Sequence, residues 1–253
     1  MISEKASIGE GTSIGAYTVI EDDAVIGREC VIGHHAVIRS GTVVGDRVRI
    51  DDFADIGKLP MKAAGSAVTK EEPLEVCRIG DGCIIGTHAV LYRGCVVEEK
   101  TLVADLASVR EHVHIGKRTI IGRGAAVENF CEIGSDTKIE TNAYITAHSV
   151  IGEHCFIAPG VVTSNDNFAG RTEERFERFQ GVTVENGGRI GAGCVVLPGK
   201  VIGADALAAA GSVVTKDAPP EKVVLGSPAK VVGDVPSEQL LERQRMKPPK
   251  RDA

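Results

Sequence analysis

The sequence predicts an all-β protein, a three-sided parallel β-helix, because an aliphatic residue recurs every six positions. The recurrence runs from position 8 to 56, from 79 to 157 and from 190 to 214. A small residue usually stands two positions before each of these aliphatic anchors, and residues two apart point to the same side of a strand. Apolar spacing near 3.6, which a helix requires, is absent. The three runs hold nine, fourteen and five repeats, and at three repeats per coil they predict roughly nine stacked coils.

The composition supports a globular fold whose core consists of small and β-branched side chains. Of the 253 residues, 43% are hydrophobic and 25% are charged, whereas aromatic residues make up 4% and Trp is absent. The net charge of −6 argues against a general nucleic-acid binder. The sequence shows neither a run of 18 apolar residues nor a secretory leader. We therefore expect a cytoplasmic protein that binds neither nucleic acid nor membrane.

The cysteines fall into the same repeat. All seven stand two positions before an anchor, in the slot that small residues fill elsewhere, and no two form a CxxC pair. We expect them to be buried thiols that pack as small hydrophobic side chains, without disulfides and without a metal. They are Cys30, Cys77, Cys83, Cys95, Cys131, Cys155 and Cys194.

Two segments interrupt the period, and the chain ends without it. The interruptions lie near 57–78 and 163–189, so residues 1–232 are predicted to form the β-helix with two inserts. Residues 233–253 are predicted to form a short C-terminal helix and a tail. Irregular segments on a rigid scaffold commonly carry binding residues. The second insert alternates Phe with Arg, so it is expected either to build a site or to pack as an arm on a neighbouring coil or subunit.

The closing stretch carries a motif that resembles a known family. GSVVTKDAPP at 211–220, followed by GSPAK at 226–230, is similar to the ending of coenzyme A-dependent hexapeptide-repeat acyltransferases. The resemblance covers residues 7–232. It implies a left-handed β-helix, a homotrimer, and acyl transfer from a thioester in clefts between subunits.

The same resemblance implies a site for coenzyme A, with acetyl-coenzyme A as the acyl donor. Lys216, Lys222 and Lys230 would supply cations for the phosphates of this cofactor, although the chain as a whole is acidic. The alternative is an exit loop that only seals the last coil. The residues expected to bind coenzyme A are Ala158, Arg189, Ala192, Ala209, Gly211, Ser212, Lys216, Pro228 and Lys230.

The start of the second insert resembles the acceptor site of nucleotide-sugar N-acyltransferases. It reads TSNDNF at 163–168, with Arg171 nearby. In this interpretation Asn165 and Asp166 hold the hydroxyl or amine of the acceptor, and Arg171 approaches a phosphate. The alternative is an Asx turn that opens the insert.

The third group of residues concerns the catalytic base. Tyr92 stands where the similar UDP-N-acetylglucosamine O-acyltransferase has a His, and a Tyr of ordinary pKa near 10 is a poor base, which disfavours O-acylation. His88, which lies near Tyr92 and follows the first insert, is the preferred base, so the candidate catalytic residues are His88, Asp166 and Tyr92. His112 and His148 share a turn position two coils apart, about 10 Å, and are expected to contact the substrate. The zinc enzymes of this family use an H-x4-H pair, which this sequence lacks, so no metal is expected.

These observations predict a homotrimeric enzyme that transfers an acyl group, most simply acetyl, from coenzyme A to the amino group of a nucleotide-linked amino sugar. An amine carries its own lone pair, so such an enzyme chiefly needs to orient the amine at the thioester and exclude water. Two alternatives remain open at this point. One is an O-acetyltransferase that acts on a sugar hydroxyl, and the other is a non-catalytic β-helix used as a scaffold.

Overall fold

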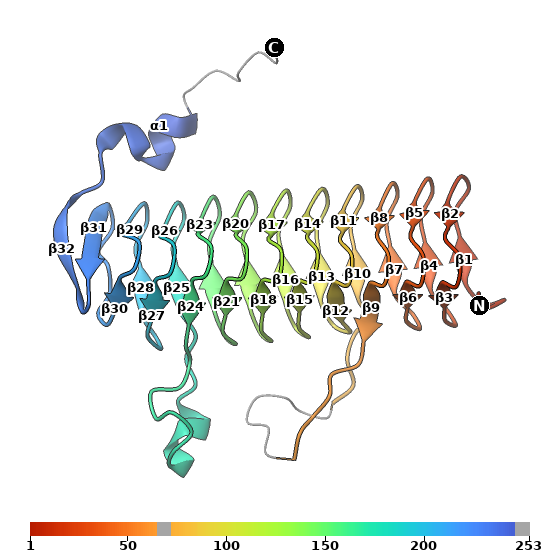
Figure 1. Cartoon of the computed structure of the whole chain (residues 1–253), viewed down its shortest axis with the longest axis horizontal. Coiled ribbons are helices and arrows are strands. Elements are labelled where there is room, and N and C mark those ends of the chain that lie inside the picture. Colours follow the sequence, from red (N-terminus) through yellow and green to blue (C-terminus); the bar gives the residue numbers. More distant parts are fainter. Residues whose placement is uncertain (65–71, 246–253) are drawn as a thin grey trace.

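The computed structural model describes residues 1–64 and 72–245, and its strands wind into one long parallel β-solenoid (Figure 1). Consecutive strands belong to three different sheets, and strands one coil apart pair in parallel. Where no insert intervenes, residues 18 positions apart are therefore in register, as Ser7 is with Val25 and Ile8 with Ile26. The predicted all-β solenoid is confirmed.

Each sheet is named here by its first strand. The β1 sheet comprises β1 (Ser7–Ile8), β4 (Val25–Ile26), β7 (Val43–Val44), β10 (Arg78–Ile79), β13 (Val96–Val97), β16 (His114–Ile115), β19 (Glu132–Ile133), β22 (Val150–Ile151), β25 (Thr183–Val184) and β28 (Val201–Ile202). The β2 sheet comprises β2 (Ser13–Ile14), β5 (Val31–Ile32), β8 (Arg49–Ile50), β11 (Ile84–Ile85), β14 (Leu102–Val103), β17 (Ile120–Ile121), β20 (Lys138–Ile139), β23 (Phe156–Ile157), β26 (Arg189–Ile190), β29 (Leu207–Ala208), β31 (Lys222–Gly226) and β32 (Ala229–Asp234). The β3 sheet comprises β3 (Val19–Ile20), β6 (Val37–Ile38), β9 (Asp55–Lys58), β12 (Val90–Tyr92), β15 (Ser108–Val109), β18 (Ala126–Val127), β21 (Tyr144–Ile145), β24 (Val162–Thr163), β27 (Val195–Val196) and β30 (Val213–Val214).

The described residues form ten coils rather than the predicted nine, because two anchors were missed. They are Thr163 in β24 and Val184 in β25, which lie on either side of the second insert. Thr163 is polar, but its hydroxyl donates to the carbonyl of Tyr144 (3.0 Å) and accepts from the amide of Thr146 (2.8 Å), so it is satisfied in an inward slot. The predicted insert at 163–189 is therefore too long: β25 pairs with β22 and β28, and the irregular segment is 164–182.

The core is a column of aliphatic anchors with the small residues between them. Anchors such as Ile38, Ile85 and Ile145 are fully buried. All seven cysteines are free and buried, as predicted. Burial raises the pKa of the Cys131 and Cys155 thiols to about 12, because a thiolate would be poorly solvated there.

Glycine follows many anchors because neighbouring coils approach closely there. A Cβ on Gly9 would lie 2.5 Å from the backbone of Gly27 in the next coil, and a Cβ on Gly15 would lie 2.5 Å from Gly33. The left-handed turn conformation falls instead three residues after the anchor, where non-glycine residues such as His35 and His112 have φ values of 54° and 56°.

A hairpin and a short helical segment close the chain. β31 and β32 pair antiparallel and extend the β2 sheet, a feature that the sequence analysis did not predict. The 3₁₀ helix η2 (Ser237–Gln239) and the helix α1 (Leu241–Arg245) follow. The amide of Leu241 donates to Asp205 Oδ1 (3.0 Å), which holds this segment against the solenoid. The predicted tail after residue 245 lies outside the described residues.

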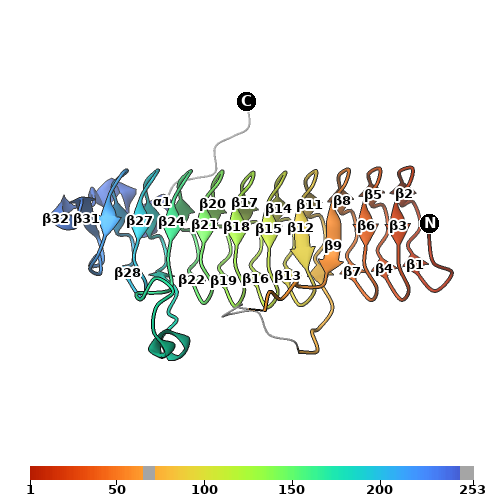
Figure 2. The same cartoon turned by 60° about the horizontal axis from the view of Figure 1, so that its bottom comes forward.

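Both inserts leave the same edge of the solenoid, which we call the insert edge. It consists of the turns that lead from the β3 sheet to the β1 sheet. Insert 1 (residues 59–77) joins β9 to β10, and insert 2 (residues 164–182), with the 3₁₀ helix η1 (Glu173–Glu177), joins β24 to β25. Figures 1 and 2 show the two inserts projecting from the same side of the coil.

Candidate functional site

Three stacked rings occupy the insert edge between the two inserts. His112, Phe130 and His148 follow the anchors of β15, β18 and β21 by three residues, so each stands at the left-handed position of its turn. The ring centroids are 4.7 Å apart for His112 and Phe130 and 5.0 Å apart for Phe130 and His148, and the planes are within 7° of parallel. The spacing of one coil thus aligns the two imidazoles on one edge.

The part of insert 1 from residue 72 onward contacts the first imidazole. Glu72 Oε1 lies 2.9 Å from His112 Nε2. The neighbouring carbonyl of Leu74 accepts a hydrogen bond from Arg93 Nε (3.2 Å), and Arg93 Nη1 also donates to the carbonyl of Ser40 (2.7 Å). Arg93 therefore fastens insert 1 to the coils, and the carboxylate of Glu72 is held where it can orient the His112 ring.

A half-buried ionic network lies beside the ring stack, at the ends of the β3-sheet strands. Arg110 makes two hydrogen bonds to the buried Glu111 carboxylate (2.8 and 2.9 Å), and its Nη1 lies 3.5 Å from Glu128 Oε2. Burial raises the pKa of Glu128, and the charge of Glu111 adds to the shift against the opposing effect of Arg110. Burial, reinforced by the charge of Glu128, also raises the pKa of the Tyr144 hydroxyl.

Tyr92 belongs to this network as a packing residue. The residue is 9% exposed, and its ring lies under two cations, with Arg110 Cζ 4.9 Å and Lys58 Nζ 5.7 Å from the ring centroid. The ring face stabilises positive charge in such contacts. These contacts give Tyr92 a role in holding Arg110 and Lys58.

Asp166 organises insert 2. Its carboxylate accepts hydrogen bonds from the backbone amides of Phe168 (2.8 Å) and Gly170 (2.9 Å). It also forms an ion pair with Arg175 Nη1 (3.2 Å). Partial burial raises the pKa of Asp166, but these bonds outweigh it and hold the pKa below its usual range. Arg175 in turn packs on the ring of Phe176, 4.7 Å from its centroid. Asp166 is therefore the centre of a turn, as in the Asx alternative.

Asn165 and Arg171, the other two residues of this segment that were predicted to contact the acceptor substrate, lie close to Asp166. The carbonyl of Asn165 accepts the amide of Gln180 (3.1 Å), which closes the base of insert 2. Arg171 is exposed, and its amide donates to the carbonyl of Phe168 (3.0 Å). Insert 2 is thus a folded arm with fixed internal contacts.

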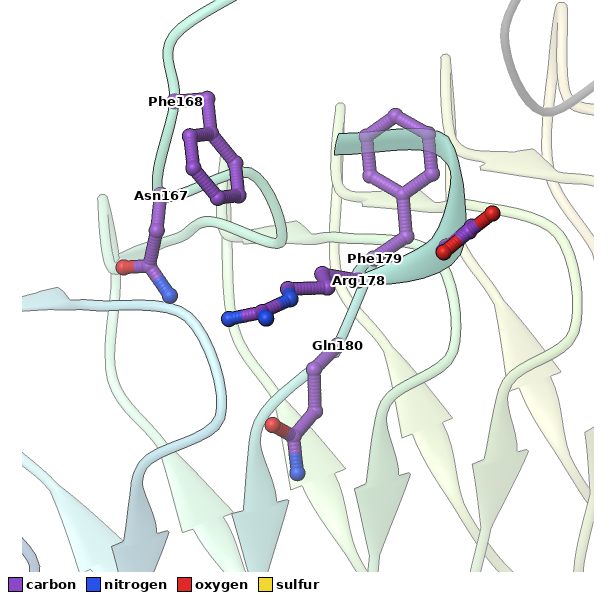
Figure 3. Close-up of a pocket in the computed structure, with 6 residues that line it drawn as sticks. Asn167, Phe168, Arg178, Phe179 and Gln180 are labelled. Atoms are coloured by element: carbon purple, nitrogen blue, oxygen red, sulfur yellow. The ribbon is translucent and has the colours of Figure 1, made fainter. Parts of the chain in front are cut away.

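A cavity of about 520 Å³ opens between the two limbs of insert 2 (Figure 3). One limb contributes Asn167 and the half-buried ring of Phe168. The other contributes Arg178, whose guanidinium extends toward Asn167 and Phe168, and Gln180 below it. The remaining lining residues are Glu177 and Phe179.

His88 lies on a different edge of the solenoid. It stands in the turn between β11 and β12, which leads from the β2 sheet to the β3 sheet. There it ends a second stack with Tyr17, His35 and Phe53, with centroids 4.8–4.9 Å apart. Within this chain, His88 and Asp166 are therefore not brought together. His88 precedes strand β12 and Tyr92 is its last residue, so the two lie on opposite borders of the β3 sheet.

Four of the nine residues predicted to bind coenzyme A form one stripe on that same edge, further toward the C-terminus. Ala158, Ala192, Ala209 and Gly211 lie in successive turns from the β2 sheet to the β3 sheet, and the amide of Gly211 donates to the carbonyl of Ala192 (2.9 Å). A Cβ on the turn glycines of these three coils would meet no atom within 4 Å. We call this stripe the glycine edge; its turn glycines are Gly160, Gly193 and Gly211.

The other predicted coenzyme residues surround the end of the glycine edge. Ser212 is buried, and its Oγ accepts the amide of Gly226 (3.1 Å), which gives it a structural role. Arg189 Nη1 donates to Gln239 Oε1 (2.8 Å) from beneath the C-terminal segment. Lys216 and Lys230 are exposed, and Pro228 lies in the turn between β31 and β32.

Several polar residues of the insert edge were not predicted from the sequence. They are Glu72, Arg110, Glu111 and Glu128, although Arg110 and Glu128 each directly follow an anchor and these two anchors lie one coil apart. Within residues 1–64 and 72–245, no cluster of three His, Cys, Asp or Glu side chains is arranged to hold a metal ion. The helices of that same part of the chain are all too short or too polar to cross a bilayer.

Two kinds of comparison identify the repeats. The family model of the bacterial transferase hexapeptide (six repeats) matches residues 5–40 and 130–165. A Staphylococcus aureus protein provisionally named an acetyltransferase is 42% identical over 78 residues, which cover 29% of this chain and 39% of that protein. The dTDP-3-amino-3,6-dideoxy-α-D-galactopyranose 3-N-acetyltransferase of Aneurinibacillus thermoaerophilus is 42% identical over 59 residues, which cover 23% of this chain and 31% of that enzyme. The chain thus spans less than half the length of these curated relatives.

Solved structures share the fold over almost the whole chain. The Arabidopsis UDP-N-acetylglucosamine acyltransferase has a TM-score of 0.63 at 20% identity and covers 96% of this chain and 74% of its own. The Campylobacter jejuni UDP-N-acetylglucosamine acyltransferase has a TM-score of 0.54 at 19% identity and covers 92% and 72%. At this identity the likeness shows the solenoid alone.

Proposed function

We propose that this chain, whose matched segments are bacterial transferase hexapeptide repeats, is an acyltransferase that moves an acetyl group from coenzyme A to the amino group of a nucleotide-linked amino sugar. In this reaction the amine nitrogen forms a bond to the thioester carbonyl carbon, and the carbon–sulfur bond breaks. The amine loses one proton, and the released coenzyme A thiolate gains one. The named relatives support the acetyl donor, and the dTDP-amino-sugar relative supports the acceptor class.

The observation that carries this proposal is the His112–Glu72 pair between the two inserts. The imidazole can accept the proton of the amine as the bond to the acyl carbon forms, and a positioned base of this kind contributes about 10²–10⁴-fold. Glu72, with its Oε1 2.9 Å from Nε2, fixes the orientation of the ring. Asp166 is a weaker candidate because three donors already occupy its carboxylate and lower its basicity.

The glycine edge suits a long, flexible thioester such as acetyl-coenzyme A. The open space at Gly160, Gly193 and Gly211 lets a ligand reach the turn backbone, where amide groups can bind its own amides. Lys216 and Lys230 are exposed near the closing hairpin and available for phosphates. The coenzyme would supply the acyl carbon, and the chain would orient it.

A homotrimer would join the two edges, which lie on opposite borders of the β3 sheet. If three β3 sheets face a common axis, the insert edge of one copy meets the glycine edge of the next. The outward side chains directly before the anchors of the β3 sheet support such a contact, because Asp55 is the one charged residue among them and it is paired with Arg39 (2.8 Å). These outward residues are Val19, Val37, Asp55, Val90, Ser108, Ala126, Tyr144, Val162, Val195 and Val213.

Two measurements test the proposed function. Calorimetric titration should show coenzyme A binding to the wild type, and no binding at millimolar ligand would overturn the donor assignment. Mass spectrometry of reactions with nucleotide-linked amino sugars should show one added acetyl group on nitrogen. Acetylation on a hydroxyl would instead support the O-acetyltransferase, for which a base such as His112 is equally suitable.

The assembly is tested with a matched pair of variants. Ala126→Arg places a charge on the outer face of the β3 sheet, and Ile120→Arg places one on the outer face of the β2 sheet. Light scattering should show that Ala126→Arg alone dissociates the trimer and loses activity. A trimer that tolerates Ala126→Arg, or a wild-type monomer that is fully active, would contradict the shared site.

A further inference from the structure

The arm formed by insert 2 is preorganised, which distinguishes it from an ordinary surface loop. Asp166 binds two amides of its own turn and Arg175, and Arg175 packs on Phe176 and Phe179. Phe176 and Phe179 meet edge to face with centroids 6.3 Å apart. These contacts fix the backbone that carries the cavity residues, so binding there costs less ordering than in a loop without internal contacts.

The residues that line the cavity carry two aromatic rings, two side-chain amides, one guanidinium and one carboxylate. Phe168 offers an aromatic surface, and Arg178 extends beneath it from the opposite limb (Figure 3). Asn167 and Gln180 each offer a donor and an acceptor, and Glu177 adds an acceptor. Arg178 also pairs with Glu174 (2.7 Å), which steadies its planar group.

We propose that this cavity is a nucleobase site. A base is a flat heterocycle whose faces stack on aromatic rings and on guanidinium planes, and whose edges alternate donors and acceptors. Phe168 and Arg178 provide the two faces, and Asn167 and Gln180 provide the edge partners. A lipid chain would leave the two amides and the carboxylate unpaired, and a simple sugar would not need both flat surfaces.

The ligand that supplies the base follows from the proposed function, on which this part of the inference rests. Insert 2 and the His112–Glu72 pair lie on the same edge, so a base held by the arm belongs to the acceptor and the amino sugar points along the edge toward His112. The second possible source is the adenine of coenzyme A. The two sources share their chemistry and are separated by the choice of nucleotide below.

The absence of Trp from the chain allows a direct test. Phe168→Trp places a single fluorophore in the cavity wall, and a stacked base should quench it. Nucleoside monophosphates with uracil, thymine or guanine are titrated against ribose 5-phosphate, which lacks a base, and adenosine 3′,5′-bisphosphate, which represents the coenzyme end. Phe156→Trp, an exposed position on the β2 sheet, is the matched control for non-specific quenching.

The expected result is saturable quenching of the Phe168→Trp protein by one of the three acceptor-type nucleotides and none by ribose 5-phosphate. Quenching by adenosine 3′,5′-bisphosphate alone would overturn the acceptor assignment. Equal quenching of the Phe156→Trp protein, or no quenching by any nucleotide, would overturn the site itself.

Calorimetry on proteins without Trp supplies the second measurement. Phe168→Ala should raise the Kd of the bound nucleotide about fivefold or more, which corresponds to the weakest stacking of one base on one aromatic ring. Gln180→Ala should change the preference among bases. Unchanged affinity in both variants would contradict the proposal, whatever the fluorescence shows.

The acetyl-transfer assay separates this inference from the proposed function. If an amino sugar 1-phosphate is acetylated with the same KM as the nucleotide-linked sugar, the base site is wrong while the enzyme assignment stands. If nucleotides bind through Phe168 but no amine is acetylated, the base site stands and the proposed reaction fails.

Discussion

The solenoid carries two similar stacks of aromatic and imidazole rings, but only one of them lies beside the inserts. Tyr17, His35, Phe53 and His88 stack on the edge between the β2 and β3 sheets, and His112, Phe130 and His148 stack on the insert edge. Both follow from a ring at the left-handed turn position of successive coils, about 4.8 Å apart.

The difference between the stacks lies in their surroundings. Tyr17 is 78% exposed and Phe53 is 48% exposed, so the first stack stands in solvent. The second stack lies between two inserts, and an insert carboxylate contacts its first imidazole at 2.9 Å. The two stacks thus use the same regular turn position, and the inserts determine which histidine has a carboxylate partner.

The largest expected effect contrasts the two terminal histidines. His112→Ala should lower kcat/KM about 100-fold or more, because it removes the proposed proton acceptor, whereas His88→Ala should stay within a few-fold of the wild type. Steady-state acetyl transfer measures both. The comparison is reversed if His88→Ala is the more damaged enzyme.

The next effect contrasts the central rings. Phe130→Ala removes the surface that aligns His112 and His148, so activity should fall about tenfold while the protein loses about 1–3 kcal/mol from two ring contacts. Phe53→Ala should lose a similar amount of stability and little activity. Urea unfolding and kinetics on the same samples would show whether stability and activity separate in this way.

A smaller effect concerns the arm. Asp166→Ala should expose insert 2 to protease and weaken nucleotide binding while the thermal unfolding of the coils is unchanged. Because the pKa of Asp166 is lowered in the fold, its stabilising contacts are present above the unfolded pKa of about 3.9 and fade as the pH falls through the lower native value. Limited proteolysis between pH 3 and pH 7 measures this, and loss of protection above about pH 5 would contradict it.

The last prediction concerns the buried cysteines of the core, which should affect the regions around both stacks alike. The folded pKa values are about 12 for Cys131 and Cys155 and about 11 for Cys83, against about 8.5 in an unfolded chain. Between these values the native state binds more protons than the unfolded state, so stability should fall as the pH rises above about 8.5. The native thiols should also resist a thiol reagent at neutral pH, and fast labelling without unfolding would refute their burial.

The solenoid could be predicted from sequence because its determinants repeat locally. The six-residue anchors, the small residues before them and the cysteine slots each specify the same inward face. The left-handed coil is predicted only by the family resemblance, since parallel crossovers are otherwise right-handed. Thr163 escaped the pattern because its hydroxyl is satisfied by the backbone of the neighbouring coil, which no period reveals.

The candidate site could be predicted only in part because it depends on which edge each turn occupies. His112, His148 and Asp166 were identified, and they do share the insert edge. His88 lies near Tyr92 in sequence, but the strand between them carries them to opposite borders of the β3 sheet. Glu72 reaches His112 through the path of insert 1, and that contact across 40 positions has no periodic signal.

The parallel winding also fixes the distance between the two inserts. From β9 to β24 the β3 sheet advances five coils, so the bases of the two inserts stand about 24 Å apart, and this gap can change only in steps of one coil, about 4.8 Å. Evolution can therefore lengthen or shorten the distance between the arms by duplicating or deleting eighteen residues, without redesigning either arm. The length of a ligand that reaches from one arm to the other can therefore change only in steps of one coil.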